Sequence, residues 1–579
     1  MNVSEQLLKI LTDEGVTQIF GVAGDALNPL VSALGKQDTV QWVSMKHEGN
    51  ASYAAFAQGE IGGNFGVCAS TVGPGALHLI NGLYNAKKER SPVLAITGQV
   101  PVKYLGTNYH QEADLQKIYD DVCEYQAIVR SPEEAPRTIL RAIRIALNKR
   151  CVCRIELPSD VAQMEAEGQE FVKKVFRSDS TLIPADHKLQ QAALAINQAK
   201  TVGILAGAGC RGERERVLAF ARKLHAPITH SLRACDIFDH ATEPVVGLTG
   251  LIGNPSGYKA VMECELLLML GTDFPYDHFL PKQNKVIQLD SRVESIGNRA
   301  PVDLGLHGEI GPTLEALLPL CEDKPESHFY RKCLDQFQQW KSDLRKQVDP
   351  KRDMVPVHPQ LLTMEVDKQA SADALFTIDT GTSAIWTSNF MNFDRERRVI
   401  GSFNHGSMAV ALPAAIGAQL LCPKREVWSF VGDGAFNMTL HDFSTAAQHK
   451  LPLKLVVFNN SQLGFVKIEM EEAGLAPNLD ALEVENFDFV EFARLTGGDG
   501  TTVEKADQVA QAVEAAKLST KPFIINAKVN SGELSLPPRI EPKQAFNFGI
   551  SKAKELFQAI KGDRRQWDNI RNEIEGYFD

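Results

Sequence analysis

The amino-acid sequence predicts an α/β protein with three doubly wound parallel-sheet domains and a C-terminal helical tail. Two observations predict this fold. Short apolar runs alternate with helical segments up to about residue 530, and several runs end in glycine-rich turns. Such alternation is typical of parallel sheets covered by helices. The length of 579 residues is also enough for roughly three to four domains.

The composition is that of a globular protein, with 44% hydrophobic and 23% charged residues. A net charge of −11, with no long run of Lys and Arg, argues against nucleic acid as a partner. The ten cysteines are scattered and form no CxxC pair, so we expect reduced thiols in a cytoplasmic protein. The acidic first helix is unlike a signal peptide, and no stretch approaches the ~20 apolar residues that span a bilayer.

The first third of the chain carries four short apolar runs, each followed by a polar or glycine turn. We expect strands over Gln18–Val22, Val40–Ser44, Gly66–Ser70 and Val93–Thr97. Glu48 follows the second of them, just before the Ala-rich segment Asn50–Gly59, whose small residues would allow close packing of a helix. Taken alone, Glu48 reads as a solvated residue at a helix start, where the helix dipole favours a negative charge.

The middle third begins after a charged, irregular linker that ends at Pro184. Strands are expected over Thr201–Ala206, Pro227–His230, Glu265–Leu270 and Lys285–Leu289. The first of these meets Gly207–Gly212, a GxGxxG match that is weak evidence by itself. No acidic residue ends the second strand, which argues against a standard NAD site. The domain is therefore either a nucleotide site or a structural copy of its neighbours.

The last third contains the most informative stretch. Two apolar runs, Val427–Val431 and Leu453–Phe458, are expected to form neighbouring parallel strands joined by a crossover helix. The first run ends in Gly432-Asp433-Gly434 and the second in Asn459-Asn460, with 24 residues between Gly434 and Asn459. Further strands are expected over Leu375–Asp379 and Phe523–Val529.

These strand ends combine the requirements of a metal–diphosphate site. The two glycines let the backbone approach a ligand closely, and the helix that follows offers free N–H groups to a phosphate. Asp433 and Asn460 would lie at the carboxyl ends of adjacent strands, where open α/β sheets bind ligands. Two oxygen side chains beside a diphosphate are a typical arrangement for Mg²⁺.

The GDG turn followed at this spacing by NN resembles the signature of the thiamine diphosphate-dependent enzymes. The resemblance covers about residues 3–545 and implies thiamine diphosphate and Mg²⁺ as cofactors. It implies that Asp433, Asn460 and the backbone carbonyl of Gln462 bind the metal. The remaining thiamine diphosphate contacts that it implies are Gly406, Ser407, Met408, Gly432, Gly434, Ala435, Leu463, Gly464 and Phe465. Met408 would be the apolar buttress under the bent cofactor, although a Met in an Ala-rich segment is more often a core residue.

Lys46-His47-Glu48 resembles the RHE-like context of the family's catalytic glutamate. The resemblance implies that Glu48 hydrogen-bonds N1′ of the aminopyrimidine and promotes loss of the thiazolium C2 proton. A carboxyl in an apolar pocket has the raised pKa that this role needs. Gln111 matches a further family position, but the residue before it, normally Phe, is His110. His110 could hold the substrate carboxylate or move a proton, or it is merely a tolerated replacement.

The middle third is similar to the flavin-binding stretches of the family's pyruvate oxidase branch, and most similar to the bacterial quinone-dependent pyruvate dehydrogenases, also called pyruvate oxidases. The resemblance implies that FAD binds there. The residues implied to contact it are Arg233, Thr249, Gly250, Leu251, Ile252, Gly253, Gly271, Thr272, Asp273, Phe274, Pro275, Tyr276 and Asp290. The alternative is a domain retained without flavin, as in the thiamine decarboxylases.

Phe465 and the residues after it bear on the reaction. In the flavin-dependent pyruvate oxidases an aromatic residue here lies between thiamine and flavin, whereas acetohydroxyacid synthases carry a Trp a few residues later. Val466–Met470 contains no Trp. The resemblance therefore implies that pyruvate is oxidised to acetate and CO₂, with a membrane quinone as electron acceptor. A phosphate- and O₂-dependent oxidase, a carboligase and a non-catalytic scaffold are the alternatives; intact Glu48, Asp433 and Asn460 argue against the scaffold.

The same resemblance divides the chain. It implies a pyrimidine-binding domain over residues 1–175, a central FAD-binding domain over 186–325, a diphosphate- and Mg²⁺-binding domain over 355–530, and a tail over 531–579. Glu48 and Asp433 would then meet across subunits of a homodimer or homotetramer. In the quinone-dependent enzymes that the chain resembles, the tail binds membranes and is autoinhibitory. Here its basic residues (Lys552, Lys554, Lys561, Arg564 and Arg565) could place it on the inner face of the cell membrane. Its acidic end weakens that reading, and docking on a subunit is the alternative.

Overall fold

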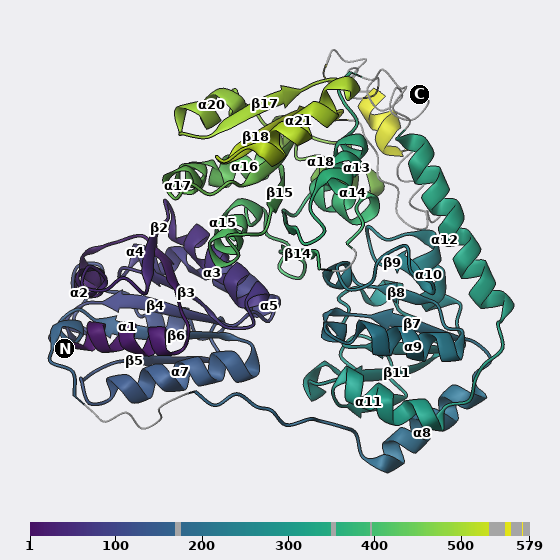
Figure 1. Ribbon diagram of the computed structural model, residues 1–579, viewed down its shortest axis with the longest axis horizontal. Coiled ribbons are helices and arrows are strands. Elements are labelled where there is room, and N and C mark those ends of the chain that lie inside the picture. The colour runs from purple at the N-terminus through teal and green to yellow at the C-terminus, as the bar shows by residue number, and fades with distance from the viewer. Residues whose placement is uncertain are drawn as a thin grey trace.

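The computed structural model describes residues 1–167, 175–348, 355–393, 396–531 and 550–556, together with positions 565 and 570. Three six-stranded sheets follow one another along the chain, and each lies between layers of helices (Figure 1). All pairings between their strands are parallel. The predicted α/β class with three doubly wound sheets is thus confirmed.

The strands are short and end close to the glycine-rich and polar turns. In the first sheet they are β1 (Gln18–Gly21), β2 (Gln41–Ser44), β3 (Gly66–Ser70), β4 (Val93–Gln99), β5 (Tyr125–Ile128) and β6 (Val152–Pro158). The central sheet contains β7 (Val202–Ala206), β8 (Ile228–His230), β9 (Val245–Leu248), β10 (Leu266–Leu270), β11 (Lys285–Asp290) and β12 (Leu304–His307). The third sheet contains β13 (Leu375–Ile378), β14 (Arg398–Gly401), β15 (Val427–Gly432), β16 (Lys454–Asn459), β17 (Asp499–Val503) and β18 (Phe523–Lys528).

The helices connect these strands. In the first domain they are α1 (Val3–Asp13), α2 (Asn28–Leu34), α3 (Glu48–Ile61), α4 (Pro74–His78), α5 (Ile80–Lys88), α6 (Leu115–Ile118) and α7 (Ala135–Lys149). The central sheet is accompanied by α8 (Asp186–Gln198), α9 (Arg214–Leu224), α10 (Pro255–Met262), α11 (Ile310–Leu317) and α12 (His328–Gln347). Around the third sheet lie α13 (Pro359–Gln369), α14 (Thr382–Phe390), α15 (Ala411–Leu421), α16 (Asp433–Thr439), α17 (Phe443–Gln448), α18 (Gly464–Glu472), α19 (Leu479–Leu482), α20 (Phe489–Leu495) and α21 (Ala506–Leu518).

The strand order locates the ligand-binding edges. The first and third sheets share one order, β2-β1-β3-β4-β6-β5 and β14-β13-β15-β16-β18-β17. The central sheet runs β12-β11-β10-β7-β8-β9, which is the order typical of dinucleotide-binding folds. Ligands of such sheets bind beyond the carboxyl ends of the strands, where the order reverses. These switch points lie between β7 and β10 in the central sheet, and between β13 and β15 in the third.

Helices α3 and α15 join the first and third domains (Figure 1). α3 is buried from Glu48 to Gly59, as expected for a helix with small residues on every side. A Cβ on Gly417 of α15 would lie 2.2 Å from the carbonyl oxygen of Ala54, so the two backbones are almost in contact. The prediction that the Ala-rich segment packs closely on another element is confirmed.

Most of the predicted tail, including Lys561 and Arg564, lies outside the described residues. In the described part, Lys552 forms an ion pair with Glu471 at 2.9 Å, and Arg565 with Asp480 at 2.8 Å. Lys554 also donates a hydrogen bond to the carbonyl oxygen of Gly474. These residues therefore dock on the third domain of their own chain. No helix within the described ranges has the length and apolar character needed to cross a membrane.

Candidate active site

Asp433 begins α16 directly after β15, and its carboxylate is 2% exposed. Oδ1 accepts a hydrogen bond from the backbone N–H of Gly434 (2.9 Å), and Oδ2 accepts one from that of Ser461 (2.6 Å). Burial raises the pKa of the Asp433 carboxyl, and these hydrogen bonds oppose the rise. The predicted partner Asn460 begins the loop after β16, which also includes Ser461. β15 and β16 are parallel neighbours, so their ends lie at the same edge of the sheet. The two predicted metal ligands therefore lie on adjacent strand ends.

Asn486 organises this edge and was missed by sequence reasoning. Its side-chain amide donates to Asp433 Oδ2 at 2.8 Å and to Asn459 Oδ1 at 3.0 Å. Its side-chain oxygen, Oδ1, accepts a hydrogen bond from the side chain of Asn437. The segment before it is tied to the loop after β16, because Gln462 forms an isolated bridge with Glu483. Asn486 thus fixes the orientation of the carboxylate that is expected to bind the metal.

Three glycines leave open space beside this edge. A Cβ built on Gly381, Gly406 or Gly432 would meet nothing within 4 Å, and Gly381 and Gly406 have φ values of 140° and 70°. Gly434 differs, because a Cβ there would lie 2.8 Å from Leu463 Cδ2 and 3.5 Å from Met408 Cε. The buried Ala435 follows it in α16. The backbone is therefore shaped to admit a ligand, with Met408 and Leu463 packed beside the turn.

Glu48 is the first residue of α3 and is 8% exposed. Its Oε2 lies 2.9 Å from Nδ1 of His78, and the ligand atoms of Glu48, His78 and His47 all lie within 4.8 Å of one another. The imidazoles of His47 and His78 stack with a centroid separation of 4.6 Å. Burial is the main cause of a lowered pKa for His47. Glu48 is thus placed beside two imidazoles, and sequence reasoning did not single out His78.

The pyrimidine-side residues also meet the first domain. The Ser407 hydroxyl lies 2.6 Å from the phenolic oxygen of Tyr53, and Asn81 donates to that same phenol at 2.9 Å. His405, just before Gly406, lies 3.0 Å from Asn81. Residues of the first and third domains are therefore in direct contact within one chain at this point.

His110 and Gln111 belong to the segment between β4 and α6. His110 is exposed in a turn, and Gln111 has a φ of 64°. A Cβ on Gly73 would lie 2.5 Å from the carbonyl oxygen of Gln111, so the turn rests on the loop after β3. Neither residue lines the cavity described next.

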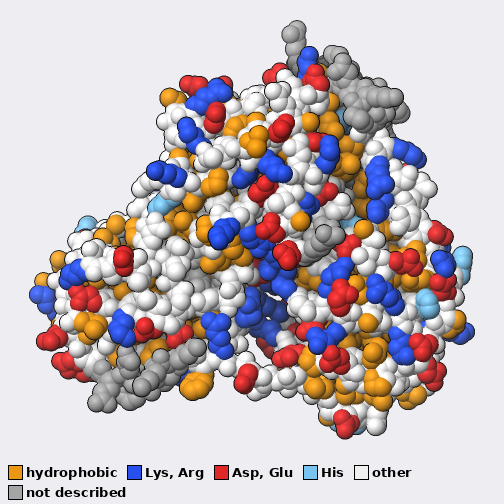
Figure 2. All heavy atoms as spheres, in the orientation of Figure 1, with side chains coloured by type: hydrophobic (Ala, Val, Ile, Leu, Met, Phe, Trp, Pro, Cys, Tyr) orange, Lys and Arg blue, Asp and Glu red, His pale blue; other side chains and the backbone are white. Residues whose placement is uncertain are grey.

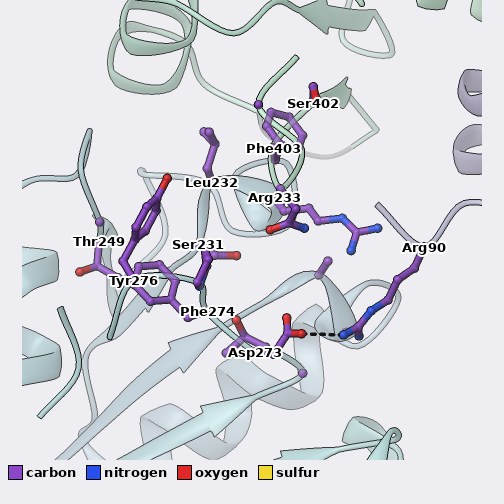
Figure 3. A pocket seen from close by; sticks show the side chains of 18 of the residues that line it. Arg90, Ser231, Leu232, Arg233, Thr249, Asp273, Phe274, Tyr276, Ser402 and Phe403 are labelled. Atoms are coloured by element: carbon purple, nitrogen blue, oxygen red, sulfur yellow. Dashed lines mark hydrogen bonds and ion pairs between the residues drawn. The ribbon is translucent and has the colours of Figure 1, made fainter. Parts of the chain in front are cut away.

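A cavity of about 380 Å³ extends from the switch point of the central sheet to the third domain. Its central-domain walls are the loops after β7, β8, β9, β10 and β11, and Gly406 and Phe465 reach it from the third domain. Figure 3 shows part of this lining, with Ser402 and Phe403 from the third domain and Ser231 and Arg233 from the central domain. Of the residues implied to contact FAD, Gly253 alone does not line it; its N–H donates to the carbonyl oxygen of Gly250. The lining includes Arg233, Thr249–Ile252, Gly271–Tyr276 and Asp290. The Oγ1 of Thr249 is buried without a hydrogen-bond partner among the described residues.

Comparison with known proteins identifies the family. The N-terminal thiamine pyrophosphate-binding domain of the thiamine pyrophosphate enzymes matches residues 1–118. The family's central domain matches 189–317, and its C-terminal thiamine pyrophosphate-binding domain matches 379–527. The chain belongs to the thiamine pyrophosphate enzymes.

Individual relatives span almost the whole length of this thiamine pyrophosphate enzyme. It is 33% identical over 96% of both chains to a putative thiamine pyrophosphate-containing protein of Bacillus subtilis. It is 27% identical to a pyruvate oxidase of Lactiplantibacillus plantarum, over 96% of this chain and 93% of that protein. It is 28% identical to an acetolactate synthase large subunit of Corynebacterium glutamicum, over 91% of this chain and 86% of that protein.

The residues of this thiamine pyrophosphate enzyme fit a magnesium diphosphate group. The open space at Gly406 and Gly432 provides room, the N-terminus of α16 offers N–H groups, and the oxygens of Asp433 and Asn460 are hard ligands. A further acid lines the cavity: Asp379 follows β13 directly and is 1% exposed. Its Oδ1 accepts N–H groups from Val410 (2.6 Å) and Ala411 (2.9 Å), and burial raises its pKa to about 7.

Proposed function

We propose that this enzyme oxidatively decarboxylates pyruvate to acetate and CO₂ with thiamine diphosphate, Mg²⁺ and FAD, and that a membrane quinone accepts the electrons. It would then be a quinone-dependent pyruvate dehydrogenase. The observation that supports this most is the continuous cavity. A flavin nucleotide in a central sheet of dinucleotide-binding order would reach Phe465 and Gly406, beside the thiamine diphosphate groups. Thr249 Oγ1, which has no hydrogen-bond partner in the described part of the chain, offers that nucleotide a hydrogen-bonding group.

The bound cofactors supply the electron sink for decarboxylation and the acceptor for two electrons. The chain supplies position and proton exchange. Asp433, Asn460 and the carbonyl oxygen of Gln462 would hold Mg²⁺, with Asn486 orienting the carboxylate. Glu48 would exchange a proton with N1′ of the aminopyrimidine, and its contact with His78 holds its carboxyl in one orientation. Phe465 lines the cavity from the third domain and would separate the two cofactor sites.

We also propose that two copies of the chain build each site. Arg90 is the cavity-lining residue of the first domain, whereas Glu48 lies elsewhere, beside His47 and His78. A second copy that brings its Glu48 to the third domain would complete the site. A homodimer is the minimum assembly of this kind, and a homotetramer would contain two such pairs.

Acetolactate formation is the second candidate, because an acetolactate synthase matches this chain about as well as the pyruvate oxidase does. The segment Val466–Met470 favours oxidation, since it lacks the Trp expected of carboligases. A phosphate- and O₂-dependent oxidase would need the same cofactors. It would be distinguished from the proposed enzyme by its need for phosphate and by its products.

One assay of the purified chain separates these reactions. With pyruvate, thiamine diphosphate and Mg²⁺, we expect a protein with a flavin absorption spectrum that reduces a quinone analogue and releases acetate. A protein without flavin that forms acetolactate would refute the proposal in favour of the carboligase. Phosphate dependence with peroxide and acetyl phosphate as products would select the oxidase.

The acceptor implies contact with a lipid surface, for which the tail is the candidate segment. A chain truncated at about residue 541 should lose activation by anionic vesicles while keeping its activity with a water-soluble acceptor. Equal responses of the full and truncated chains to the vesicles would contradict a membrane role and favour docking through Lys552 and Arg565.

A further inference from the structure

Arg90 lines the cavity from the first domain, whereas the residues around it belong to the central domain. It follows α5 in the first domain and adopts a left-handed backbone conformation with φ 54°. Its Nη2 donates to Asp273 Oδ2 at 2.8 Å and to Ser295 Oγ at 3.1 Å, both in the central domain. Figure 3 shows this side chain entering beside the Asp273 loop, on the same side of the cavity as Arg233.

Arg233 is held by the residue next to Arg90. Its Nε lies 2.9 Å from Glu89 Oε2, and it also donates to the backbone carbonyl of Glu89. The other oxygen of Glu89 accepts the backbone N–H of Asn404 in the third domain. The turn Glu89–Arg90 thus connects all three domains at the wall of the cavity, through two ion pairs with the central domain and one hydrogen bond from the third domain.

This wall is where the strand order predicts the phosphates of a dinucleotide. The loop after β10, which contains Asp273, forms one side of the switch point, and the glycine loop after β7 forms the other. Asp290 at the end of β11 also lines the cavity, and its charge acts on Arg90. A dinucleotide with its diphosphate at the switch point would therefore pass next to Arg90.

The charges at this wall favour an added anion. Burial is the main cause of a lowered pKa for Arg90, and Arg292 and Arg233 add repulsion while Asp273 and Asp290 oppose it. Figure 2 shows Lys and Arg side chains around the hollow between the first and central domains, although the whole chain carries −11. Within the described residues both side-chain hydrogen bonds of Arg90 come from Nη2, so Nη1 and Nε are available as donors.

We infer that Arg90 is a ligand-binding residue of this cavity: with Arg233 it binds the diphosphate of a flavin nucleotide, so that the first domain completes the central domain's nucleotide site. This inference rests on the proposed function for its ligand. Arg pairs with phosphate through two parallel N–H groups, which a Lys cannot reproduce. The nucleotide then contributes to holding the first and central domains together.

Nucleotide binding to the full chain tests this assignment. FAD, ADP and adenosine are titrated into flavin-depleted protein by calorimetry, for the wild type and for Arg90→Ala and Arg90→Lys. We expect Arg90→Ala to weaken FAD and ADP about 10- to 100-fold, because a charge-assisted hydrogen bond to phosphate is lost. Adenosine, which has no phosphate, should bind all three proteins equally. Arg90→Lys should recover only part of the loss.

Two control variants separate contact from charge and from folding. Arg292→Ala removes a nearby positive charge that does not line the cavity, and should change ADP affinity by less than Arg90→Ala does. Ser295→Ala removes a partner of Arg90 that does not line the cavity, and should preserve ADP binding if Arg90 contacts the ligand. Thermal unfolding without nucleotide shows whether each variant is folded.

Several outcomes would overturn the assignment. Unchanged ADP affinity in Arg90→Ala, or an equal loss for ADP and adenosine, would make Arg90 a structural residue while leaving the flavin proposal intact. Weakened ADP binding in Ser295→Ala equal to that in Arg90→Ala would assign the effect to the interdomain contact of Arg90. A wild type that binds ADP but not FAD would refute the flavin and keep the diphosphate site, and binding of neither would refute both.

Discussion

The first and third sheets have the same strand order but carry different chemistry at their carboxyl edges. After β15 and β16 of the third sheet come Asp433 and Asn460, with Asn486 donating to the carboxylate. The corresponding loops of the first sheet, after β3 and β4, offer no carboxylate in that place. The first sheet instead places Glu48 after its edge strand β2, at the start of α3.

The difference shows how one topology can supply two complementary half-sites. The third sheet presents hard oxygen ligands and a free helix N-terminus, which suit a metal–diphosphate group. The first sheet presents one buried carboxyl beside imidazoles, which suits proton exchange. Because the strand order is shared, the division of labour resides in the loop residues alone, and single substitutions should break one half without the other.

The largest effect is expected from the two half-site carboxylates. Glu48→Gln should lower turnover by about 10²–10⁴-fold, because proton exchange is lost while metal ligands remain. Its affinity for thiamine diphosphate with Mg²⁺, measured by calorimetry, should stay near that of the wild type. Asp433→Asn should show the opposite pattern, in which the affinity for thiamine diphosphate with Mg²⁺ is lost first.

Mixing the two variants sharpens this comparison. If each site takes Glu48 from one copy and Asp433 from another, a mixed dimer contains one intact and one doubly substituted site. Co-expressed Glu48→Gln and Asp433→Asn chains should then recover activity that neither shows alone. No recovery in a purified mixed dimer would contradict a site shared between copies, and an active Glu48→Gln protein would refute the role of that carboxyl.

A smaller effect is expected from Asn486→Ala, which removes the amide that orients Asp433. Loss of an outer partner of a metal ligand costs about 10- to 100-fold in metal affinity. We therefore expect the Mg²⁺ concentration for half-maximal activity to rise by that factor, with turnover at saturating Mg²⁺ retained. Asn437→Ala, one step further from the metal side, is the matched control and should have a weaker effect.

The smallest effect concerns Asp379, whose counterpart after β1 of the first sheet is Val22. A folded-state pKa of about 7, against an ordinary value of 3.8, means that the folded chain keeps a proton that the unfolded chain has lost. This acid therefore destabilises the fold increasingly as pH rises from about 4 to 7, by at most about 1.36 kcal/mol per pH unit. The free energy of unfolding of Asp379→Asn, measured in urea, should therefore rise by more than about 1 kcal/mol relative to that of the wild type between pH 5 and pH 8. Asp38→Asn, an exposed control, should show no such gain.

The fold was predictable because the inner strands are buried on both faces and appear as continuous apolar runs. β3 was expected over Gly66–Ser70 and is found there, and the pairing of β15 with β16 is confirmed. Of the strands for which no range was predicted, β5, β9, β12, β14 and β17 lie at the edges of their sheets, whereas β6 lies inside the first sheet. An edge strand pairs on one side only and needs a less apolar sequence, as in the half-buried β5.

The candidate site was predictable where a short motif carries it. Asp433 and Asn460 follow apolar runs, and Glu48 follows a strand. Asn486, His78 and Arg90 could not be found in this way, because each acts through a contact with residues distant in sequence. The roles of His110 and Gln111 remain predictions, since the structure places them in a turn away from the cavity.

The contact between α3 and α15 has a consequence for the synthesis of this chain. Ile61 ends α3, and Ala411, 350 residues later, begins α15. At about 5–20 residues per second, the ribosome needs roughly 18–70 s to make that interval. During this time the small-residue surface of α3, buried in the finished molecule, has no α15 to cover it. A chaperone would thus bind the nascent chain after the first domain is complete. The surface of α3 would be covered once the segment of α15 that contains Gly417 has been made.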